Sequence, residues 1–220
     1  MDSETTKTGH QAGGKRMVQD PRRKNIVLGA EGSDALLGDY ADALAQGLKS
    51  VDGAALKRAI DLVVQCAQDG GTVYFAGNGG SASICDHLVC DFVKGTYHDR
   101  HPPVNACSMT DNVALYSAIA NDFGFEGVFE FQVKTRLKAQ DVLIAVSSSG
   151  NSMNIIKAVR AARAKGIPTI GLSGFSGGKL AEEAEVSMVV PVQNYGVVED
   201  AHSALLHMMV QSIGNQRDYG

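Results

Sequence analysis

Four serines stand close together in residues 147–152, which read Ser-Ser-Ser-Gly-Asn-Ser and directly follow the apolar run at residues 142–146. An amphipathic segment comes next, so the pattern predicts a strand, a loop and a helix. Hydroxyl and backbone N–H groups at the start of a helix, with the positive end of its dipole, suit a phosphate dianion. The loop lacks the lysine of a nucleotide triphosphatase P-loop. One interpretation is therefore a site for a phosphate on a small molecule such as a sugar, and the other is a polar turn with a serine N-cap.

A second loop of small residues, at residues 77–82, reads Gly-Asn-Gly-Gly-Ser-Ala and follows a short β-prone run. It fits the G-x-G-x-x-A form of a dinucleotide fingerprint. That fingerprint expects an acidic residue about 20 residues on, at the end of the next strand, and Asp111 comes too late. We therefore expect a second polar cradle for a sugar or phosphate. Residues 174–180 approach a P-loop, but their glycine spacing and the missing Ser/Thr after the lysine exclude one.

His87 and Asp91 stand four residues apart in a segment of helical character, so their side chains project from one helix face. This spacing suits metal ligands. Taken alone it also fits a surface pair in which the histidine donates to the aspartate, the commoner use of such a pair. Cys90 is a conceivable further ligand, although we expect it to be a buried helix cysteine.

The last predicted helix carries Glu199, His202 and His207. His207 stands among leucines and methionines, where an imidazole needs a polar partner. Imidazole and carboxylate both suit Zn²⁺. The two histidines and two carboxylates of the two helices could therefore form a zinc site.

These residues need elements that hold them together. Two amphipathic helices are predicted first, one starting after Ser33 as N-cap and the other ending at Gly70-Gly71. Short apolar runs then alternate with helical segments. We predict strands at residues 72–76, 104–108, 142–146, 167–172 and 186–191, and helices at residues 83–94, 112–120, 125–137, 153–165, 177–184 and 199–213. This alternation predicts an α/β fold, a doubly wound parallel sheet flanked by helices with an N-terminal helical hairpin. Ligands in such folds bind beyond the carboxyl ends of the strands, where both small-residue loops fall.

The composition sets the class of protein. The chain has 220 residues, 44% apolar content and a formal net charge of −4, enough for one sizeable core. Residues 1–32 are predicted to be a poorly ordered basic tail, a solvated extension rather than an arm for nucleic acid or membrane. Residues 33–215 are predicted to form a single domain. The mild acidity gives no reason to expect nucleic acid, and no apolar run approaches the roughly 18 to 20 residues of a membrane span.

A cytoplasmic location is the default expectation, because residues 1–20 lack the apolar stretch of a secretory signal. The cysteines show no Cys-x-x-Cys spacing and have mostly apolar neighbours. We expect reduced, largely buried thiols at Cys66, Cys85, Cys90 and Cys107.

Seven segments together resemble the sugar isomerase (SIS) domain, and within it the phosphoheptose isomerases. They are residues 77–81, His87 with the acid at 91, residues 120–124, 141–144, 147–152 and 177–179, and the helix from Glu199 to His207. The match runs in order from about residue 35 to about residue 213. The resemblance implies conversion of sedoheptulose 7-phosphate to D-glycero-D-manno-heptose 7-phosphate through a zinc-assisted enediolate.

The resemblance also implies a role for each matched residue. The sugar site would be lined by Asn78, Gly79, Gly80 and Ser81, with Asn121 and Asp122. The phosphate would be held by Ser147, Ser148, Ser149 and Ser152. The zinc ligands would be His87, Asp91, Glu199 and His207, with Asp91 and His207 also the acid/base pair and Glu199 within reach of substrate. Members of the family are homotetramers whose N-terminal helices pack together and whose active sites combine neighbouring subunits.

Three positions depart from the family pattern, which has Glu at 91, Gln at 199 and an acidic residue at 90. Asp91 reaches about 1.5 Å less than glutamate, and a misplacement near 1 Å can reduce a rate about a hundredfold. The alternatives are a non-catalytic SIS module, either a sugar-phosphate sensor or an oligomeric adaptor, and an isomerase of another phosphosugar. The retained ionisable set favours an enzyme.

Overall fold

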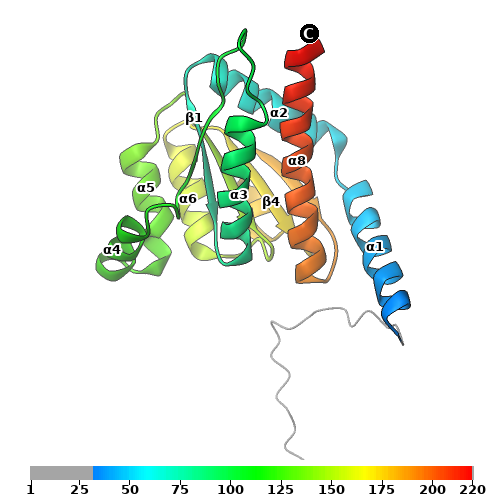
Figure 1. The fold of residues 1–220 in the computed structure, drawn as a ribbon. Coiled ribbons are helices and arrows are strands. Elements are labelled where there is room, and N and C mark those ends of the chain that lie inside the picture. Colours follow the sequence, from blue (N-terminus) through cyan, green and yellow to red (C-terminus); the bar gives the residue numbers. More distant parts are fainter. Residues whose placement is uncertain (1–31, 220) are drawn as a thin grey trace, which may run out of the picture.

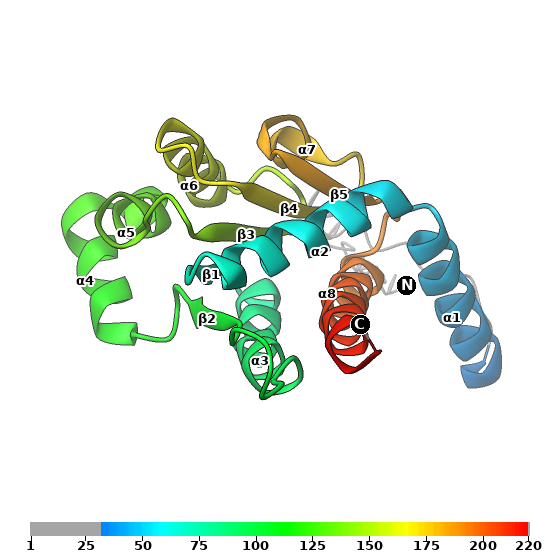
Figure 2. The same ribbon diagram turned by 90° about the horizontal axis from the view of Figure 1, so that it is seen from above.

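Five parallel strands form one sheet in the order β2-β1-β3-β4-β5 in the computed structural model, which describes residues 32–219 (Figures 1 and 2). The strands are β1 (Thr72–Gly77), β2 (Asn105–Ser108), β3 (Val142–Ser147), β4 (Thr169–Gly174) and β5 (Val186–Val190). The helices are α1 (Ser33–Lys49), α2 (Gly53–Gln68), α3 (Gly80–Lys94), α4 (Val113–Phe123), α5 (Val128–Arg136), α6 (Met153–Ala164), α7 (Gly178–Glu183) and α8 (Tyr195–Tyr219), with the 3-10 helix η1 (Phe125–Gly127). The predicted doubly wound α/β fold is confirmed. The predicted tail lies outside the described residues, apart from Gly32.

Helices cover both faces of the sheet, with α2, α3 and α8 on one face and α5, α6 and α7 on the other (Figure 2). Side chains of β1 alternate between two cores, because successive residues of a strand point to opposite faces. Val73 and Phe75 are buried in the first core and Ala76 in the second. Every residue of the central strand β3 is buried, as a strand covered on both faces requires.

The N-terminal hairpin packs by its two helices in different ways. Helix α2 contributes buried residues such as Val63 to the first core, whereas α1 lies against α8 (Figure 1). The Tyr40 hydroxyl of α1 donates to Asp200 Oδ2 of α8 at 2.6 Å. Leu36 and Leu37 of α1 remain 47% and 70% exposed, so much of the apolar face of α1 is uncovered in the single chain.

Some predicted helix and strand ends were wrong by a few residues. Ser33 is the first residue of α1, and Gly32 occupies the cap position without a side-chain hydrogen bond. The fourth strand starts at Thr169, because Pro168 has no N–H to donate to the ladder, although its carbonyl accepts from Leu143 N. Helix α8 begins at Tyr195, four residues earlier than expected.

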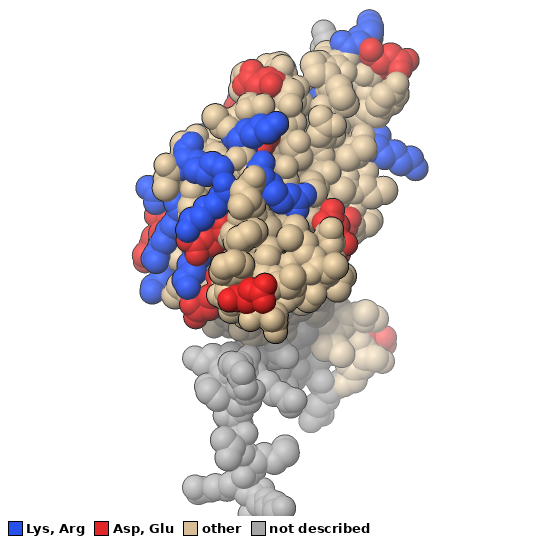
Figure 3. Space-filling view, turned by 90° about the vertical axis from the view of Figure 1, so that its left-hand side faces the viewer, with Lys and Arg blue, Asp and Glu red and all other residues tan. Residues whose placement is uncertain are grey.

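The charged surface beside α4, α5 and α6 faces the viewer in Figure 3. Lys and Arg side chains gather there, and Asp and Glu lie among them. Ion pairs join Lys157 to Glu126 at 2.7 Å and Arg160 to Glu183, so the basic charge is partly compensated on the surface itself. No helix within residues 32–219 combines the length and apolar character needed to cross a membrane.

Candidate active site

The two small-residue loops leave the sheet side by side at its carboxyl edge. β1 and β3 are neighbours, and the chain continues from β1 toward β2 on one side and from β3 toward β4 on the other. This is the point at which strand order reverses, where doubly wound sheets bind ligands. The loop after β1 leads into α3 and the loop after β3 leads into α6.

A polar pocket of about 200 Å³ lies between these loops and the start of α8. It is lined by Asn78, Ser81, Val146, Ser147, Ser148, Ser149, Ser152, Tyr195 and Glu199. All four serines predicted to hold phosphate are therefore present. Among the described residues, buried Ser148 Oγ has no hydrogen-bond partner. A ligand oxygen would satisfy it, since an unpaired buried hydroxyl destabilises the protein.

The serine loop is fixed by close backbone contact with the turn after β4. Gly150 has a φ of +64°, and a Cβ there would lie 1.9 Å from the Gly177 carbonyl oxygen. Leu180 N donates to Gly150 O at 2.9 Å. The sequence assigned no role to residues 177–179. In the structure, this turn packs against the backbone of the serine loop and holds it in place.

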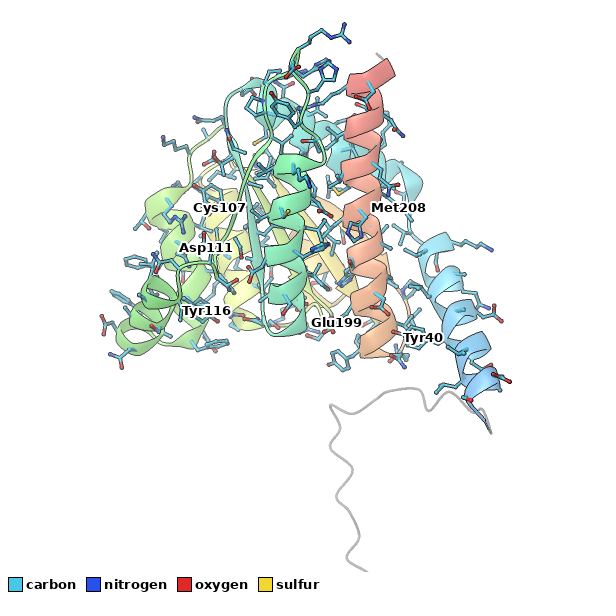
Figure 4. All side chains as sticks on the ribbon, in the orientation of Figure 1. Tyr40, Cys107, Asp111, Tyr116, Glu199 and Met208 are labelled. Carbon is cyan, nitrogen blue, oxygen red and sulfur yellow. The ribbon has the colours of Figure 1, made fainter. Side chains whose placement is uncertain are left out.

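The loop after β1 contributes an amide and two glycines. Asn78 exchanges two hydrogen bonds with the buried Asn154 of α6, at 2.9 and 2.8 Å. Gly79 has a φ of +54° at the start of α3. A Cβ on Gly80 would lie 2.6 Å from Glu199 Oε2, so the absence of a side chain here lets the carboxylate lie over the helix start (Figure 4). Burial and then the neighbouring Asp200 raise the pKa of Glu199, which favours its protonated form relative to an exposed glutamate.

His87, Asp91 and His207 form a second group on the outer side of α3 and α8. The two Nε2 atoms lie 3.2 Å apart, and Asp91 Oδ2 lies 3.1 Å from His207 Nε2 and 3.5 Å from His87 Nε2. His207 thus has the polar partner that an imidazole among apolar sequence neighbours needs. The side chains remain partly exposed, at 57% for His87, 30% for Asp91 and 38% for His207.

Glu199 is not part of this group. The three ligand atoms lie within 4.8 Å of one another, and among the described residues no fourth carboxylate or imidazole joins them. Glu199 precedes His207 by eight residues on α8, a rise of about 12 Å, and faces the serine pocket instead.

Asn121 and Asp122 lie apart from both groups. They stand near the end of α4, are exposed, and bond to each other through Asn121 Nδ2 and Asp122 Oδ1 at 2.8 Å. Neither residue lines the pocket.

One expectation about a buried side chain was wrong. Cys90 is exposed rather than buried, because it lies on the outward side of α3, whereas Cys85 faces the core. His202 is fully buried, with neither ring nitrogen hydrogen-bonded among the described residues. Burial lowers the pKa of His202 to about 4.

Sequence reasoning missed Tyr195, which forms one wall of the pocket. Its signal was its position four residues before Glu199, which places both side chains on one face of α8. The predicted helix began too late to include it.

Comparison with known proteins shows the family of the chain. A family model described as SIS domain matches residues 39–174. Phosphoheptose isomerase of Rhodospirillum rubrum is 37% identical over 173 residues, which cover 79% of this chain and 85% of that protein. The chain belongs to the SIS-domain family, among the phosphoheptose isomerases.

Solved structures of this family superpose on the chain. Phosphoheptose isomerase GmhA from Neisseria gonorrhoeae gives a TM-score of 0.73 at 31% identity, covering 82% of this chain and 96% of that one. A phosphoheptose isomerase from Francisella tularensis gives 0.75 at 27% identity, covering 83% and 96%. The SIS-domain resemblance inferred from the motifs is confirmed.

Proposed function

We propose that this SIS-domain protein is an aldose–ketose isomerase that converts sedoheptulose 7-phosphate to D-glycero-D-manno-heptose 7-phosphate. The observation that carries the proposal is the pairing of two sites in one chain of the phosphoheptose isomerase family. A serine-lined pocket lies at the carboxyl edge of the sheet, and an imidazole–carboxylate cluster lies farther along α8.

The serine loop binds the phosphate and so orients the sugar. Hydroxyl groups, the N-terminus of α6 and the unpaired Ser148 hydroxyl suit a dianion. The reacting carbons of a heptose 7-phosphate lie at the opposite end of the carbon chain from the phosphate. Binding free energy gained at the phosphate can therefore hold those carbons in place without contacting them.

The reaction moves one proton between neighbouring carbons. A base removes a proton from C1 to give an enediolate, a proton returns to C2, and the hydroxyl proton passes from O1 to O2. Asp91 and His207 are the proposed acid/base pair, because Asp91 Oδ2 and His207 Nε2 lie 3.1 Å apart and both are accessible to a substrate. Positioned acid/base groups of this kind contribute about 10² to 10⁴ in rate.

The cluster also fits a zinc ion. Around a tetrahedral ion with bonds of 2.0 to 2.1 Å, ligand atoms stand about 3.4 Å apart, and the three distances are 3.1, 3.2 and 3.5 Å. Three protein ligands with one open position are the pattern of catalytic zinc. Bound to His87, Asp91 and His207, the ion would supply Lewis-acid stabilisation of negative charge on the sugar oxygens. A ligand bound firmly to zinc is a poor base, so Asp91 and His207 would transfer protons only while Oδ2 and Nε2 are free of the ion. For Glu199 to be a fourth ligand, α3 or α8 would have to rearrange. Without that rearrangement, Glu199 acts toward the substrate alone.

We further propose that the enzyme is a homotetramer with shared active sites. Asn121 and Asp122 lie on α4, away from the pocket of their own chain. If they keep this position, they can contact the sugar only in the pocket of another subunit. Exposed apolar side chains at Leu37, Val93 and Met208 support burial of these helices against another copy. The cytoplasmic location stays a prediction from the sequence.

The test is to incubate the purified, zinc-replete protein with sedoheptulose 7-phosphate and to follow aldoheptose phosphate by NMR, beside an Asp91→Ala control. Product that disappears in the control supports the proposal. Stoichiometric zinc without product would indicate a different phosphosugar, and neither zinc nor product would indicate a non-catalytic binding module.

A further inference from the structure

Phe175 has a backbone conformation that its side chain does not favour. Its φ is +55°, and it is the one residue other than glycine with a positive φ in the described part of the chain. Left-handed backbone crowds the Cβ of any L-residue and is rare for bulky side chains. Glycine could occupy this position at no steric cost, so the phenyl ring must provide something that offsets the strain.

The ring of Phe175 contributes to neither hydrophobic core. It instead packs edge-on against Tyr195, with ring centroids 4.8 Å apart. Tyr195 lies at the first turn of α8 and lines the serine pocket. The strained residue Phe175 therefore contacts a side chain that lines the proposed active site.

The turn that carries Phe175 is itself attached to the pocket. Gly177 N closes it by donating to Gly174 O at 2.8 Å, and Gly174 N donates to Ser148 O of the serine loop at 2.8 Å. A Cβ on Gly174 would lie 2.5 Å from a methyl carbon of Val198 on α8. The turn thus fixes the serine loop and the start of α8 relative to each other, with the aromatic pair on the side of α8.

Tyr195 differs from the rest of the pocket in chemistry. The other lining residues offer hydroxyl, amide and carboxylate groups, apart from Val146. An aromatic face provides an apolar surface for the C–H groups of a sugar chain, whereas phosphate is bound by donors and gains nothing from it. Tyr195 and Glu199, four residues apart on α8, project on one side of the helix, so a substrate that reaches Glu199 passes the ring.

We propose that Tyr195 contacts the carbon chain of the bound phosphosugar, and that Phe175 is a positioning residue that holds the Tyr195 ring in place at the expense of backbone strain. This inference rests on the proposed function, because it assumes a sugar phosphate in the serine pocket. It assigns to the aromatic pair a share of selectivity for sugar phosphates over free phosphate.

The test compares Phe175→Gly with the wild-type protein in three measurements: the KM for sedoheptulose 7-phosphate, its calorimetric Kd, and the Kd for inorganic phosphate. We expect a rise of at least fivefold in KM and Kd for the sugar phosphate, with less than a twofold change in the phosphate Kd. Phe175→Tyr, which keeps a ring, should restore the wild-type values. Tyr195→Ala should match Phe175→Gly, and the double variant should add little, because coupled residues are not additive.

The matched control is Phe125→Gly. Phe125 also pairs edge-on with a tyrosine, Tyr116, at 6.3 Å, and neither residue lines the pocket. It should leave all three constants unchanged. A denaturant midpoint for each variant confirms that it is folded.

An unchanged sugar-phosphate KM and Kd in folded Phe175→Gly would overturn the inference, as would an equal loss of phosphate binding. Wild-type protein that binds sedoheptulose 7-phosphate more tightly than phosphate without turning it over would overturn the proposed function alone. Wild-type protein that binds both equally and forms no product would overturn both.

Discussion

The amides of Asn78 and Asn154 bond to each other in both directions, Nδ2 to Oδ1 at 2.9 and 2.8 Å. One belongs to the loop after β1 and the other to α6, which follows the serine loop. The pair therefore connects the two loops of the pocket, and it fixes the orientation of the Asn78 side chain at the site.

Asn154→Leu tests whether this hydrogen-bonded pair holds the two loops together. Leucine has the branched shape of asparagine but no amide, so it leaves the half-buried Asn78 amide without its two partners, and each lost hydrogen bond costs about 0.5 to 1.5 kcal/mol. We expect urea denaturation to show that loss of unfolding free energy and calorimetry to show weaker sugar-phosphate binding. Asn215→Leu, at an exposed position of α8, is the matched control and should change neither. Wild-type stability in Asn154→Leu would mean that the pair does not hold the loops.

Gly80→Ala tests the position of Glu199. The new Cβ would meet the Glu199 carboxylate, the flexible end of a side chain, at 2.6 Å, so the carboxylate should move while the fold survives. We expect a KM for the sugar phosphate raised severalfold, with a free energy of unfolding within about 1 kcal/mol of wild type. Gly53→Ala, also at the first residue of a helix but with open space around it, should leave KM unchanged. Identical kinetics in the two variants would remove Glu199 from the substrate site.

The fold was largely predictable from the sequence. Apolar runs alternating with amphipathic segments predicted all five strands and their parallel arrangement, because a strand buried on both faces must be apolar throughout. Strand order was not predictable. It depends on crossovers that no local pattern encodes, and it is the order β1-β3 that brings the two loops together.

The candidate site was predictable in its residue types and less so in its grouping. Spacing four residues apart correctly placed His87 and Asp91 on one helix face. Spacing alone could not show that Glu199 turns to the serine pocket while His207 turns to His87, since both lie on the same helix and their rotation depends on packing. The same limit made the expected burial of Cys90 wrong and left the full burial of His202 unpredicted.

His202 should make stability depend on pH. Burial lowers its folded-state pKa to about 4, below the value of about 6.5 in an unfolded chain. Between these values the unfolded state binds the proton and the folded state does not, so stability falls as pH falls, by up to about 1.4 kcal/mol per unit. We expect His202→Gln to lose this part of the dependence, giving unfolding free energies at pH 7 and pH 5 that differ by about 2 kcal/mol less than in wild type. Parallel pH profiles would show that His202 is not buried as a neutral ring.

Metal content tests the zinc site separately from activity. We expect about one zinc per chain after dialysis, by elemental analysis, and at least tenfold weaker binding in His87→Ala, which removes one of three ligands. His98→Ala is the matched control, because His98, like His87, packs edge-on against a second histidine, His101, but lies outside the cluster. Equal zinc loss in both variants would place the metal elsewhere. A wild-type chain that retains no zinc would remove the metal from the account.

The most direct test of the account is the turnover of sedoheptulose 7-phosphate by His207→Ala, with the Kd of the same sugar phosphate measured by calorimetry. His207 belongs to the cluster proposed for the proton transfer, whereas the serine pocket is proposed to hold the phosphate. The account predicts that kcat falls by at least about a hundredfold while the Kd stays within about threefold of wild type. Unchanged turnover would contradict it and would remove the His87–Asp91–His207 cluster from the reaction.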